Sequence, residues 1–438
     1  MIEKILSRKN ILLASKQVVS NQGSAGVDGM TVKELPKHLK AHQRSIVQSV
    51  VEGSYRPQPI LGVEIPKENG KKRLLGIPTV ADRMLQQAVH QTISPRFEVE
   101  FKEHSYGFRP GRNAHQAVLR AQQNIHDGYG HIVDIDLKSF FDEVDHAILL
   151  QLLHEKVACA KTLRLICQWL KAPIQINGKL VKRTKGVPQG SPLSPLLSNI
   201  MLHELDKELE RRGHRYVRYA DDFSVYTKSK KAARRVGNSI YLFLKDRLKL
   251  PINREKSGLR RPVQFSLLGF KFVPSYKKGE KGQYQLTVKD KKWASLKQEL
   301  KAVTRKTLPL TFSERLAKLK EIHHGWINYF RPASMHAKLK ELDSWVRNRL
   351  RYCIWKDWKK PERKRKNLVR LGIAFGQAYA WSRTRMGGWA VAQSPILVTT
   401  VTLERLAKRG YESMLSYYEK VSPQFNEPLY ARPARTVV

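Results

Sequence analysis

The residues best suited to metal chemistry in this chain are two adjacent carboxylates, Asp221 and Asp222. Apolar and polar residues alternate on both sides of them, at positions 216–218 and 223–226. This alternation is typical of half-buried strands, so we expect the pair at the tip of a β-hairpin. A hairpin tip holds short acidic side chains rigidly, and carboxylate oxygens are ligands that Mg²⁺ prefers. The pattern therefore predicts one half of a metal-dependent nucleotidyl-transfer site.

A third carboxylate, Asp136, is the natural partner of this pair, because it lies near the end of an apolar strand expected at 132–137. Joining a nucleotide to a primer end uses two metal ions about 3.5–4 Å apart, which acidic residues from separate segments usually hold. Taken singly, an Asp at a strand end or in a turn is more often a turn or cap residue. The occurrence of both sites in one very basic chain favours the metal site.

A third segment, at residues 186–195, reads as a tight loop bounded by prolines that leads into a helix from Leu196 to about Leu205. Exposed backbone N–H groups at such a helix entrance can receive a base or a phosphate. Taken alone, this loop is a weak signal.

The net charge indicates the kind of partner. The 438 residues include 81 Lys and Arg but only 38 Asp and Glu, which gives a formal net charge of +43. Such an excess opposes a compact fold unless a polyanion neutralises it, and nucleic acid is the obvious polyanion. An anionic membrane is the alternative, but no apolar run approaches the ~18 residues of a spanning helix. Because the N-terminus lacks a signal-peptide core and Cys159, Cys167 and Cys353 lack a CxxC spacing, we expect a cytosolic protein with reduced thiols.

The hydrophobic pattern predicts an α/β (α+β) region followed by helices. The expected elements are helices within 1–60 around a glycine-rich loop at 21–29, a strand at 62–65, a helix through 82–88, a mixed sheet packed by helices within 131–275, and a helical region after about residue 290. In that last region, Thr311 or Ser313 is the expected N-cap of a first helix. A second helix should carry Leu339 to Ile354 on one face and continue through a run of cations.

That run of cations is interleaved with Trp355 and Trp358. A charged run is usually a solvated helix face, but here the aromatic rings offer stacking and the total charge is extreme, which favours nucleic-acid contact. The candidate RNA-binding residues are Arg347, Arg351, Lys359, Lys360, Arg363, Lys364 and Arg365.

Together these segments resemble the reverse transcriptases encoded by group II introns, most closely the compact kind that lacks a DNA endonuclease domain. The resemblance covers nearly the whole chain and includes Tyr-Ala-Asp-Asp at 219–222 and the helical motif of the family's thumb at 325–330. The other matching segments, in the family's order, are 26–29, 65–67, 73–78, 104–110, 136–142, 188–190, 253–257 and 268–270.

The resemblance implies roles for individual positions. Asp136, Asp221 and Asp222 would be the catalytic carboxylates and the ligands of two Mg²⁺ ions, with Asp222 the lesser contributor. Lys67 and Arg73 would contact the incoming triphosphate, which suits long cationic side chains; the alternative is two solvated charges on a hairpin.

Three further positions would contact the nucleotide. Phe141 would be a steric gate that excludes a ribose 2′-hydroxyl, although core packing beside Phe140 is the alternative. Gln189 would contact the nucleotide or the template, and Lys256 would lie near the primer-side phosphates.

The resemblance also implies a right-hand polymerase. The expected parts are an N-terminal extension and fingers (1–130), a mixed-sheet palm (131–285), a helical thumb or domain X (286–385) and a short C-terminal extension (386–438). The expected activity is RNA-directed DNA synthesis from dNTPs on an RNA template and DNA primer. The expected partners also include target DNA and the parent intron RNA, which the protein would bind as a maturase to assist splicing, in a bacterial cytoplasm at the nucleoid.

Two points stay open from the sequence. One is the role of the tail and the other is the rival functions; a metal-bound His/Cys nuclease near the C-terminus is not expected, because no Cys follows Cys353 and no His follows His336. The tail from Gly387 should hold one helix, from Leu403 to Tyr418, as a residual DNA-binding extension or a cap on the thumb. The rival functions are a domesticated reverse transcriptase serving defence, CRISPR spacer capture or a retron, and a splicing factor whose polymerase site has decayed.

Overall fold

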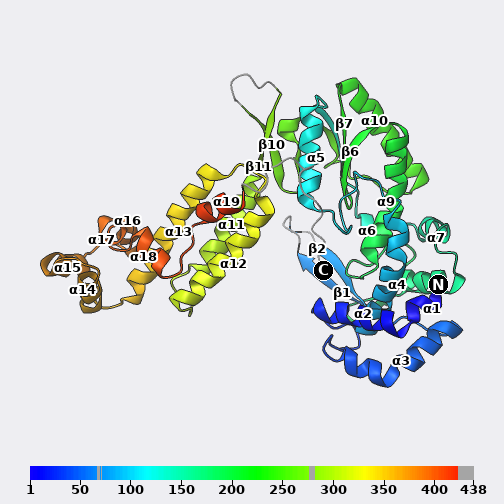
Figure 1. Ribbon diagram of the computed structural model, residues 1–438, viewed down its shortest axis with the longest axis horizontal. Coiled ribbons are helices and arrows are strands. Elements are labelled where there is room, and N and C mark those ends of the chain that lie inside the picture. The colour runs from blue at the N-terminus through cyan, green and yellow to red at the C-terminus, as the bar shows by residue number, and fades with distance from the viewer. Residues whose placement is uncertain (67–69, 71, 276–281, 423–438) are drawn as a thin grey trace. The chain divides into compact units, whose positions relative to one another are not determined.

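A computed structural model describes residues 1–66, 70, 72–275 and 282–422. Its contacts divide the chain into two compact units, Met1–Phe265 and Ser266–Val438, which are described separately below (Figure 1). The four-part division into extension and fingers, palm, thumb and tail stays a prediction.

The central sheet of the first unit has the strand order β6-β7-β3-β8, and all its ladders are antiparallel. Its strands are β3 (His131–Ile135), β6 (Arg215–Tyr219), β7 (Asp222–Thr227) and β8 (Gly258–Arg260). The strand expected at 132–137 is present as β3 but ends at Ile135, and the hairpin of β6 and β7 confirms the alternation on both sides of Asp221 and Asp222. Helix α10 packs on β3 and β7, and α5 packs on β6 (Figure 1).

A second sheet in the same unit has the order β2-β1-β4-β5 and supplies the parallel pairing of the fold, between β1 and β4. Its strands are β1 (Ile60–Pro66), β2 (Lys72–Ile77), β4 (Ile174–Ile176) and β5 (Lys179–Val181). Asn177 and Gly178 join β4 to β5 with positive φ angles of 49° and 80°. An Asn-Gly pair adopts these angles at little cost, which explains the tight turn.

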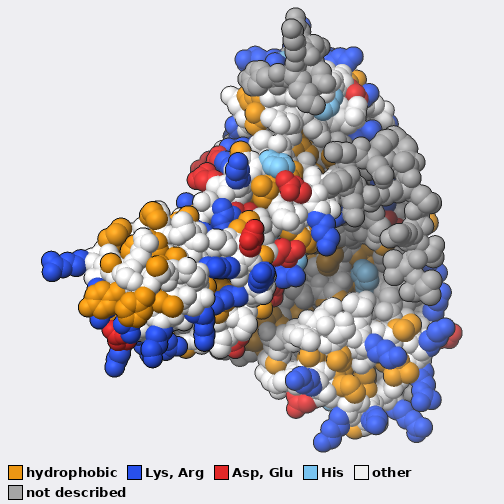
Figure 2. Space-filling view, turned by 60° about the vertical axis from the view of Figure 1, so that its left-hand side comes forward, with side chains coloured by type: hydrophobic (Ala, Val, Ile, Leu, Met, Phe, Trp, Pro, Cys, Tyr) orange, Lys and Arg blue, Asp and Glu red, His pale blue; other side chains and the backbone are white. Residues whose placement is uncertain are grey.

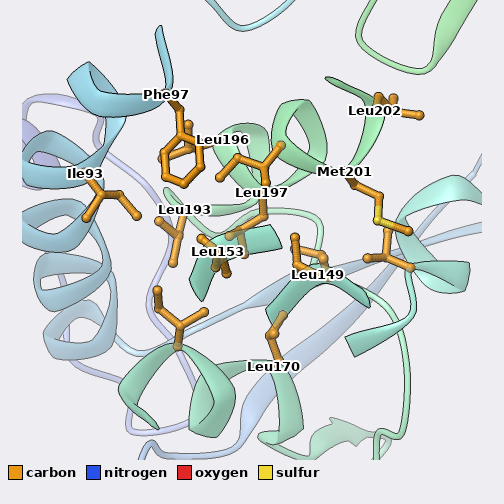
Figure 3. Packing of buried hydrophobic residues seen from close by; sticks show 14 of the residues in the cluster. Ile93, Phe97, Leu149, Leu153, Leu170, Leu193, Leu196, Leu197, Met201 and Leu202 are labelled. Atoms are coloured by element: carbon orange, nitrogen blue, oxygen red, sulfur yellow. The ribbon is translucent and has the colours of Figure 1, made fainter. Parts of the chain in front are cut away.

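The helices of the first unit enclose a large hydrophobic core, and a smaller cluster is formed by Ile60 of β1, Ala172 and Ile174 of β4. The helices are α1 (Ile2–Leu6), α2 (Arg8–Ser20), α3 (Leu35–Glu52), α4 (Val80–Glu98), α5 (Ala114–His126), α6 (Phe140–Glu143), α7 (His146–His154), α8 (Ala160–Lys171), α9 (Ser194–Arg211) and α10 (Lys230–Leu242), with a π-helical turn, η1 (Phe243–Arg247), and a 3₁₀ turn, η2 (Pro262–Gln264). Figure 3 shows this packing: Ile93 and Phe97 of α4 lie beside Leu196 at the start of α9, with Leu153 of α7 below them. The loop at 186–195 therefore packs against the apolar faces of α4 and α9, which hold it in place.

The buried carboxylate of Asp82 ties α4 to its surroundings. It accepts hydrogen bonds from the Tyr55 hydroxyl (2.8 Å), the Trp169 indole N–H (2.9 Å) and the Thr79 hydroxyl (2.8 Å). A buried carboxylate with this many donors costs little to keep. It fixes the start of α4, where Thr79 is the N-cap.

The second unit combines a small sheet with a set of helices. The sheet has the order β11-β10-β9, and its strands are β9 (Ser266–Leu267), β10 (Phe270–Pro274) and β11 (Tyr284–Val288). The helices are α11 (Asp290–Val303), α12 (Phe312–Phe330), α13 (His336–Asp357), α14 (Pro361–Arg370), α15 (Phe375–Ser382), α16 (Gly388–Gln393), α17 (Pro395–Val398), α18 (Leu403–Lys408) and α19 (Met414–Val421). Thr311 caps α12 in a capping box with Glu314, as the sequence predicts.

The expected continuation of α13 through the run of cations is wrong. Helix α13 ends at Asp357, Lys359 adopts φ +42°, and a new helix, α14, begins at Pro361. Proline disfavours helical geometry at the preceding residue but suits the first turn of a helix. Pro361 therefore separates the two helices, so the run of cations is divided between α13 and a second helix, α14.

The single helix expected at 403–418 is also wrong, because α18 and α19 are separate and Gly410 between them has φ +97°. The buried carboxylate of Asp343 on α13 accepts from the Tyr411 hydroxyl (2.9 Å), the Ser413 hydroxyl (2.6 Å) and the Met414 N–H (2.9 Å). Helix α19 also packs on α12 and α13. Of the two expectations for the tail, this packing favours a cap on the helices.

Candidate active site

Asp136 lies where the central sheet meets a neighbouring loop. The β3–β7 ladder ends at the pair Ile135 and Phe223, so the next residues along the two strands are Asp136 and Asp222. The N–H of Asp136 donates to the Ser257 hydroxyl (3.0 Å), and its carbonyl accepts from the N–H of Asn253 (2.8 Å). Sheet register and loop bonds thus fix the backbone from which the carboxylate projects.

Asp221 and Asp222 lie at the tip of the β6–β7 hairpin, as the alternation predicts. Tyr219 pairs with Asp222, which leaves Ala220 and Asp221 as the turn. Ala220 adopts φ +56°, a left-handed conformation that a non-glycine residue adopts at some cost. The surrounding contacts have to stabilise this turn, and with it the direction of the Asp221 side chain.

The three carboxylates line one cavity of about 820 Å³. Four more of the predicted site residues line the same cavity: Arg73, Phe141, Gln189 and Lys256. Lys67 lies outside the described residues. The structure thus brings seven predicted positions from separate segments of the chain together, while their individual roles stay predictions.

The carboxylates that line the cavity repel one another, and nearby cations offset part of this repulsion. Burial raises the pKa of Asp221; Arg73 opposes this rise and Asp136 adds to it. Asp222 reaches solvent, but partial desolvation and the carboxylates of Asp221 and Asp136 together raise its pKa to about 6. The Lys256 ammonium lies 3.4 Å from a carboxylate oxygen of Asp136. Carboxylates that raise one another's pKa form an oxygen-rich site that fits divalent cations.

Phe141 and its neighbour have different surroundings. Phe140 is buried in the core (2% exposed) and Phe141 is half-buried, and both are among the residues that line the cavity. The two rings meet edge to face with centroids 5.2 Å apart. Core packing therefore accounts for Phe140 and for part of Phe141, and one side of the Phe141 ring is left to the cavity.

Gln189 is held by a loop whose backbone is fixed on two sides. Its carbonyl accepts from the N–H of Gly76 on β2 (2.8 Å). On the other side, the N–H of Val187 donates to the carbonyl of Phe141 (2.6 Å). Gly190 has φ +123°, and a Cβ there would lie 2.7 Å from the carbonyl oxygen of Gly76. Glycine is therefore required for the loop to approach β2 this closely.

A second cavity of about 620 Å³ shares Arg73, Phe141, Gln189 and Asp221 with the first. Its other walls come from α2, α4 and the 186–195 loop, and include the exposed ring of Phe108. These four shared residues therefore face both cavities.

The first cavity has cationic lining residues that the sequence reasoning did not single out, namely Lys72, Lys138 and Arg254. Lys138 follows Asp136 by two positions, and Arg254 lies in the 253–257 segment. Their positions next to these motifs could have indicated that they line the site. Lys72 pairs with Glu64 across β1 and β2, with 2.5 Å between their charged atoms.

The predicted RNA-binding cations of the second unit have unequal surroundings. Lys359, Lys360 and Arg363 are exposed. The ammonium of Lys364 lies 4.3 Å from the ring centroid of Trp355, and the guanidinium of Arg365 lies 4.8 Å from that of Phe375. Lysine and arginine side chains are spread over much of the visible face in Figure 2.

Two of the predicted RNA contacts, Arg347 and Arg351, lie further inside. Arg347 is half-buried. Arg351 is 7% exposed, and its guanidinium donates to the carbonyl of Val401 (3.0 Å) and to the side chain of Asn348 (2.8 Å). Because Arg351 uses these donors inside the unit, we withdraw it from the candidate RNA surface.

A cluster of possible metal ligands in the second unit, His323, His324 and Glu412, has ligand atoms within 4.8 Å of one another. The His324 ring bonds Glu412 at 2.8 Å and stacks on Tyr417, while the Lys320 ammonium lies 3.4 Å from the same carboxylate. A cation already beside the carboxylate disfavours a metal ion. We interpret this cluster as a further attachment of the C-terminal segment to α12.

Within the described part of the chain, no helix has both the length and the apolar character that crossing a membrane requires. Cys159, Cys167 and Cys353 are free thiols, as expected.

Comparison with known proteins identifies the class to which this fold and cavity belong. Residues 65–272 match the family described as reverse transcriptase (RNA-dependent DNA polymerase), and residues 293–372 match the maturase-specific domain of group II introns. The chain belongs to the family of group II intron reverse transcriptases and maturases, and it carries a reverse transcriptase domain. The α/β region and helical C-terminal part fit this family, whose polymerases use divalent metal ions.

Two curated relatives illustrate the match. Protein YkfC of Escherichia coli (strain K12) is 32% identical over 286 residues, which cover 56% of this chain and 75% of YkfC. The group II intron-encoded protein LtrA of Lactococcus lactis subsp. cremoris is 31% identical over 317 residues, which cover 58% of this chain and 53% of LtrA. The chain thus spans about half the length of LtrA.

Among solved structures, the partial Cas6-RT-Cas1–Cas2 complex is 26% identical, with a TM-score of 0.37, and the match covers 56% of this chain and 42% of that chain. At this TM-score the likeness carries no argument.

Proposed function

We propose that this protein is an RNA-directed DNA polymerase that copies its parent group II intron RNA during retrohoming and binds the same RNA as a maturase. The observation that carries the polymerase part is the meeting of Asp136, Asp221 and Asp222 in one cavity with Arg73 and Phe141. Carboxylates from two distant segments lie together there, and burial and the charges of Asp221 and Asp136 raise the pKa of Asp222; such an oxygen-rich site is what a pair of divalent metal ions requires.

The residues of the cavity suit primer extension with dNTPs. Asp136 and Asp221 would hold two Mg²⁺ ions, with Asp222 assisting, and the metals would supply an activated 3′-hydroxyl and charge neutralisation at the triphosphate. Arg73 would bind the triphosphate, and Lys256 would lie beside the primer-side phosphates. Phe141 would exclude a 2′-hydroxyl, while Gln189 would position the nucleotide or the template.

The maturase part is supported by the maturase-specific match at 293–372 and by the exposed cations Lys359, Lys360 and Arg363 at the junction of α13 and α14. The proposed partners are the parent intron RNA, the RNA template and DNA primer, target DNA and dNTPs. A net charge of +43 suits all of these polyanions, and we place the protein in the bacterial cytoplasm, at the nucleoid.

Primer extension on an RNA template tests the polymerase proposal. The full chain should extend a DNA primer with dNTPs in Mg²⁺, stop when EDTA is added and resume when Mg²⁺ is restored. A well-folded protein that binds the duplex but adds no nucleotide at any Mg²⁺ or Mn²⁺ concentration would refute it.

Splicing of the intron RNA at low Mg²⁺ tests the maturase proposal separately. Asp221→Ala removes a metal ligand without touching the cations of α13 and α14, so splicing assistance should survive in this variant. Loss of splicing with normal RNA binding would argue against separable roles.

A further inference from the structure

The catalytic hairpin rests on a buried arginine. Arg218 is the fourth residue of β6, three positions before Asp221, and its side chain is 0% exposed. A buried guanidinium needs partners for its donors, because desolvating an unpaired charge is very costly. The direction in which those donors point therefore shows what the arginine holds in place.

The donors of Arg218 reach helix α9 and the hairpin turn. Its Nε donates to Asp206 (2.8 Å), which is likewise 0% exposed, and one terminal nitrogen donates to the side-chain oxygen of Asn199 (3.0 Å). The same nitrogen donates to the carbonyl of Ala220 (3.1 Å). That carbonyl belongs to the peptide group that leads into Asp221, so the bond restrains the orientation of the peptide bearing the carboxylate.

The backbone of Gly107 makes a second contact with the same turn. A Cβ added to Gly107 would lie 2.3 Å from the backbone nitrogen of Ala220, so the turn packs directly on the backbone of residue 107. The side-chain amide of Asn199 donates to the carbonyl of Gly107 (2.9 Å). Asn199 therefore links both supports of the turn, one through its oxygen and one through its nitrogen.

The left-handed conformation of Ala220 makes these supports necessary. At φ +56°, a non-glycine residue persists only where its surroundings hold it. Asn199 and Asp206 are seven positions apart on α9, so they lie two turns apart on one helix face and present a rigid acceptor pair to Arg218. The three N–H donors of a lysine ammonium lie on one atom, so they cannot span acceptors that the planar guanidinium reaches through separate nitrogens.

We propose that Arg218, oriented by Asp206 and Asn199, is a positioning residue that sets the turn at Ala220 and so places the Asp221 and Asp222 carboxylates for metal binding. This inference rests on the proposed function for its activity readout, but metal binding by the protein alone tests it independently. It predicts that disturbing the network weakens metal binding without changing any group that contacts substrate.

Arg218→Lys is the first variant, and Asn199→Ala, which keeps the buried ion pair, is the second. In primer extension, Arg218→Lys should lower kcat by about 100-fold, since misplacement of a reacting group by about 1 Å costs this much. The Mg²⁺ concentration for half-maximal rate should rise several-fold, while the KM for dNTP and the Kd for primer–template stay within about twofold. Asn199→Ala should shift the same quantities in the same direction by about tenfold or less.

Arg315→Lys on α12 is the matched control. Arg315 is also a buried arginine (4% exposed), and it donates to the carbonyls of Arg305 and Val303, which belong to the second unit, as Arg315 does. Its replacement should lower the melting temperature but leave the Mg²⁺ dependence unchanged. A general loss of folding is thereby separated from a displaced metal site.

Mn²⁺ titration of the free protein, followed by electron paramagnetic resonance, supplies the readout that does not need activity. Wild-type protein should show a Mn²⁺ site that Asp221→Asn abolishes, and Arg218→Lys should weaken it by about tenfold or more. If the wild type does not extend primers but Arg218→Lys still weakens this site, the proposed function fails and the positioning role stands. Either an unchanged metal affinity in folded Arg218→Lys protein or the absence of any Asp221-dependent site in the wild type overturns the positioning role.

Discussion

Among single residues, Asp222 carries the clearest electrostatic signature. Its pKa is raised to about 6 by desolvation and by the neighbouring carboxylates of Asp221 and Asp136, so the folded, metal-free protein keeps a proton that the unfolded chain releases near pH 3.8. The folded state therefore binds more protons between these two values, and the contribution of Asp222 to stability falls as the pH rises through this window.

Asp222→Asn should therefore leave the free energy of unfolding unchanged near pH 4 and raise it at about pH 7.5, by about 1 kcal/mol once the solvent exposure of the carboxyl is allowed for. Urea unfolding in EDTA at the two pH values measures this. Asp246→Asn, an exposed carboxylate on η1, is the control and should show no such difference. An Asp222→Asn protein less stable than the wild type at the higher pH would contradict the electrostatic account.

Phe141 gives the second prediction at this scale. Phe141→Ala removes the part of the ring that faces the cavity, so incorporation of ribonucleotides relative to dNTPs should rise about tenfold, or about 1.4 kcal/mol of discrimination. Single-nucleotide extension with each substrate measures the ratio. An unchanged preference in a folded, active variant would assign the ring to the core alone.

At the residue scale, the sequence predicted that Asp136, Asp221 and Asp222 would meet, and the structure places all three in one cavity. Their role as metal ligands stays a prediction. Arg351 was misassigned because net charge does not show which cation is buried. The sequence did not reveal the structural role of Arg218. In a strand that alternates apolar and polar residues, an Arg is expected on the exposed face, and only the position of α9 shows that this Arg is buried.

At the scale of elements, two buried carboxylates anchor segments distant in sequence. Asp82 holds the start of α4, and Asp343 holds the segment that leads into α19. Asp343 also accepts from the N–H of Leu415 (2.9 Å), so it caps the start of α19. Asp343 of α13 is thus one attachment of the tail, beside the contact of Glu412 with His324 on α12.

Asp343→Ala should therefore destabilise the second unit by about 3 kcal/mol, because it leaves several buried donors without an acceptor. Amide hydrogen exchange should rise first in residues 411–421, ahead of α13. Asp357→Ala, an exposed carboxylate at the end of the same helix, is the control. Protection at 411–421 equal to that of the wild type would show that apolar packing alone holds the tail.

Sequence patterns predicted the β6–β7 hairpin and the start of α12, but they missed the breaks within the helical region. The Thr311 cap of α12 and the hairpin of β6 and β7 follow from local chemistry. The break at Pro361 was readable in principle, since proline interrupts a helix, but the apolar and aromatic spacing on both sides concealed it. In the described residues 388–422, the segment that leads into α19 depends on the tertiary contact with Asp343, which no local pattern contains.

For the whole molecule, the excess of positive charge is the feature that most affects the binding of nucleic acid. Binding of primer–template or intron RNA should weaken steeply with salt, because each neutralised phosphate releases counterions. The charge predicts a polyanionic partner from composition alone. Composition does not show which cations are exposed, and the structure supplies that information for Lys359, Lys360 and Arg363.

Replacing Lys359, Lys360 and Arg363 together by Gln should reduce the slope of log K against log salt for intron RNA by up to about 2, because three phosphate contacts are lost. Filter binding across a range of KCl concentrations measures the slope. Lys207→Gln with Arg211→Gln is the control, since these cations pair with Glu204 and Glu208 on α9. An unchanged slope in the triple variant would place RNA binding elsewhere on the surface.

The measurement that tests the central claim most directly is single-turnover primer extension on an RNA template by Asp136→Asn and Asp221→Asn proteins. Their folding and duplex affinity should first be matched to the wild type. If both carboxylates hold the same pair of metal ions, each substitution alone should abolish nucleotide addition at all Mg²⁺ concentrations, and the double variant should be no worse. Near-wild-type extension by either single variant would contradict the account.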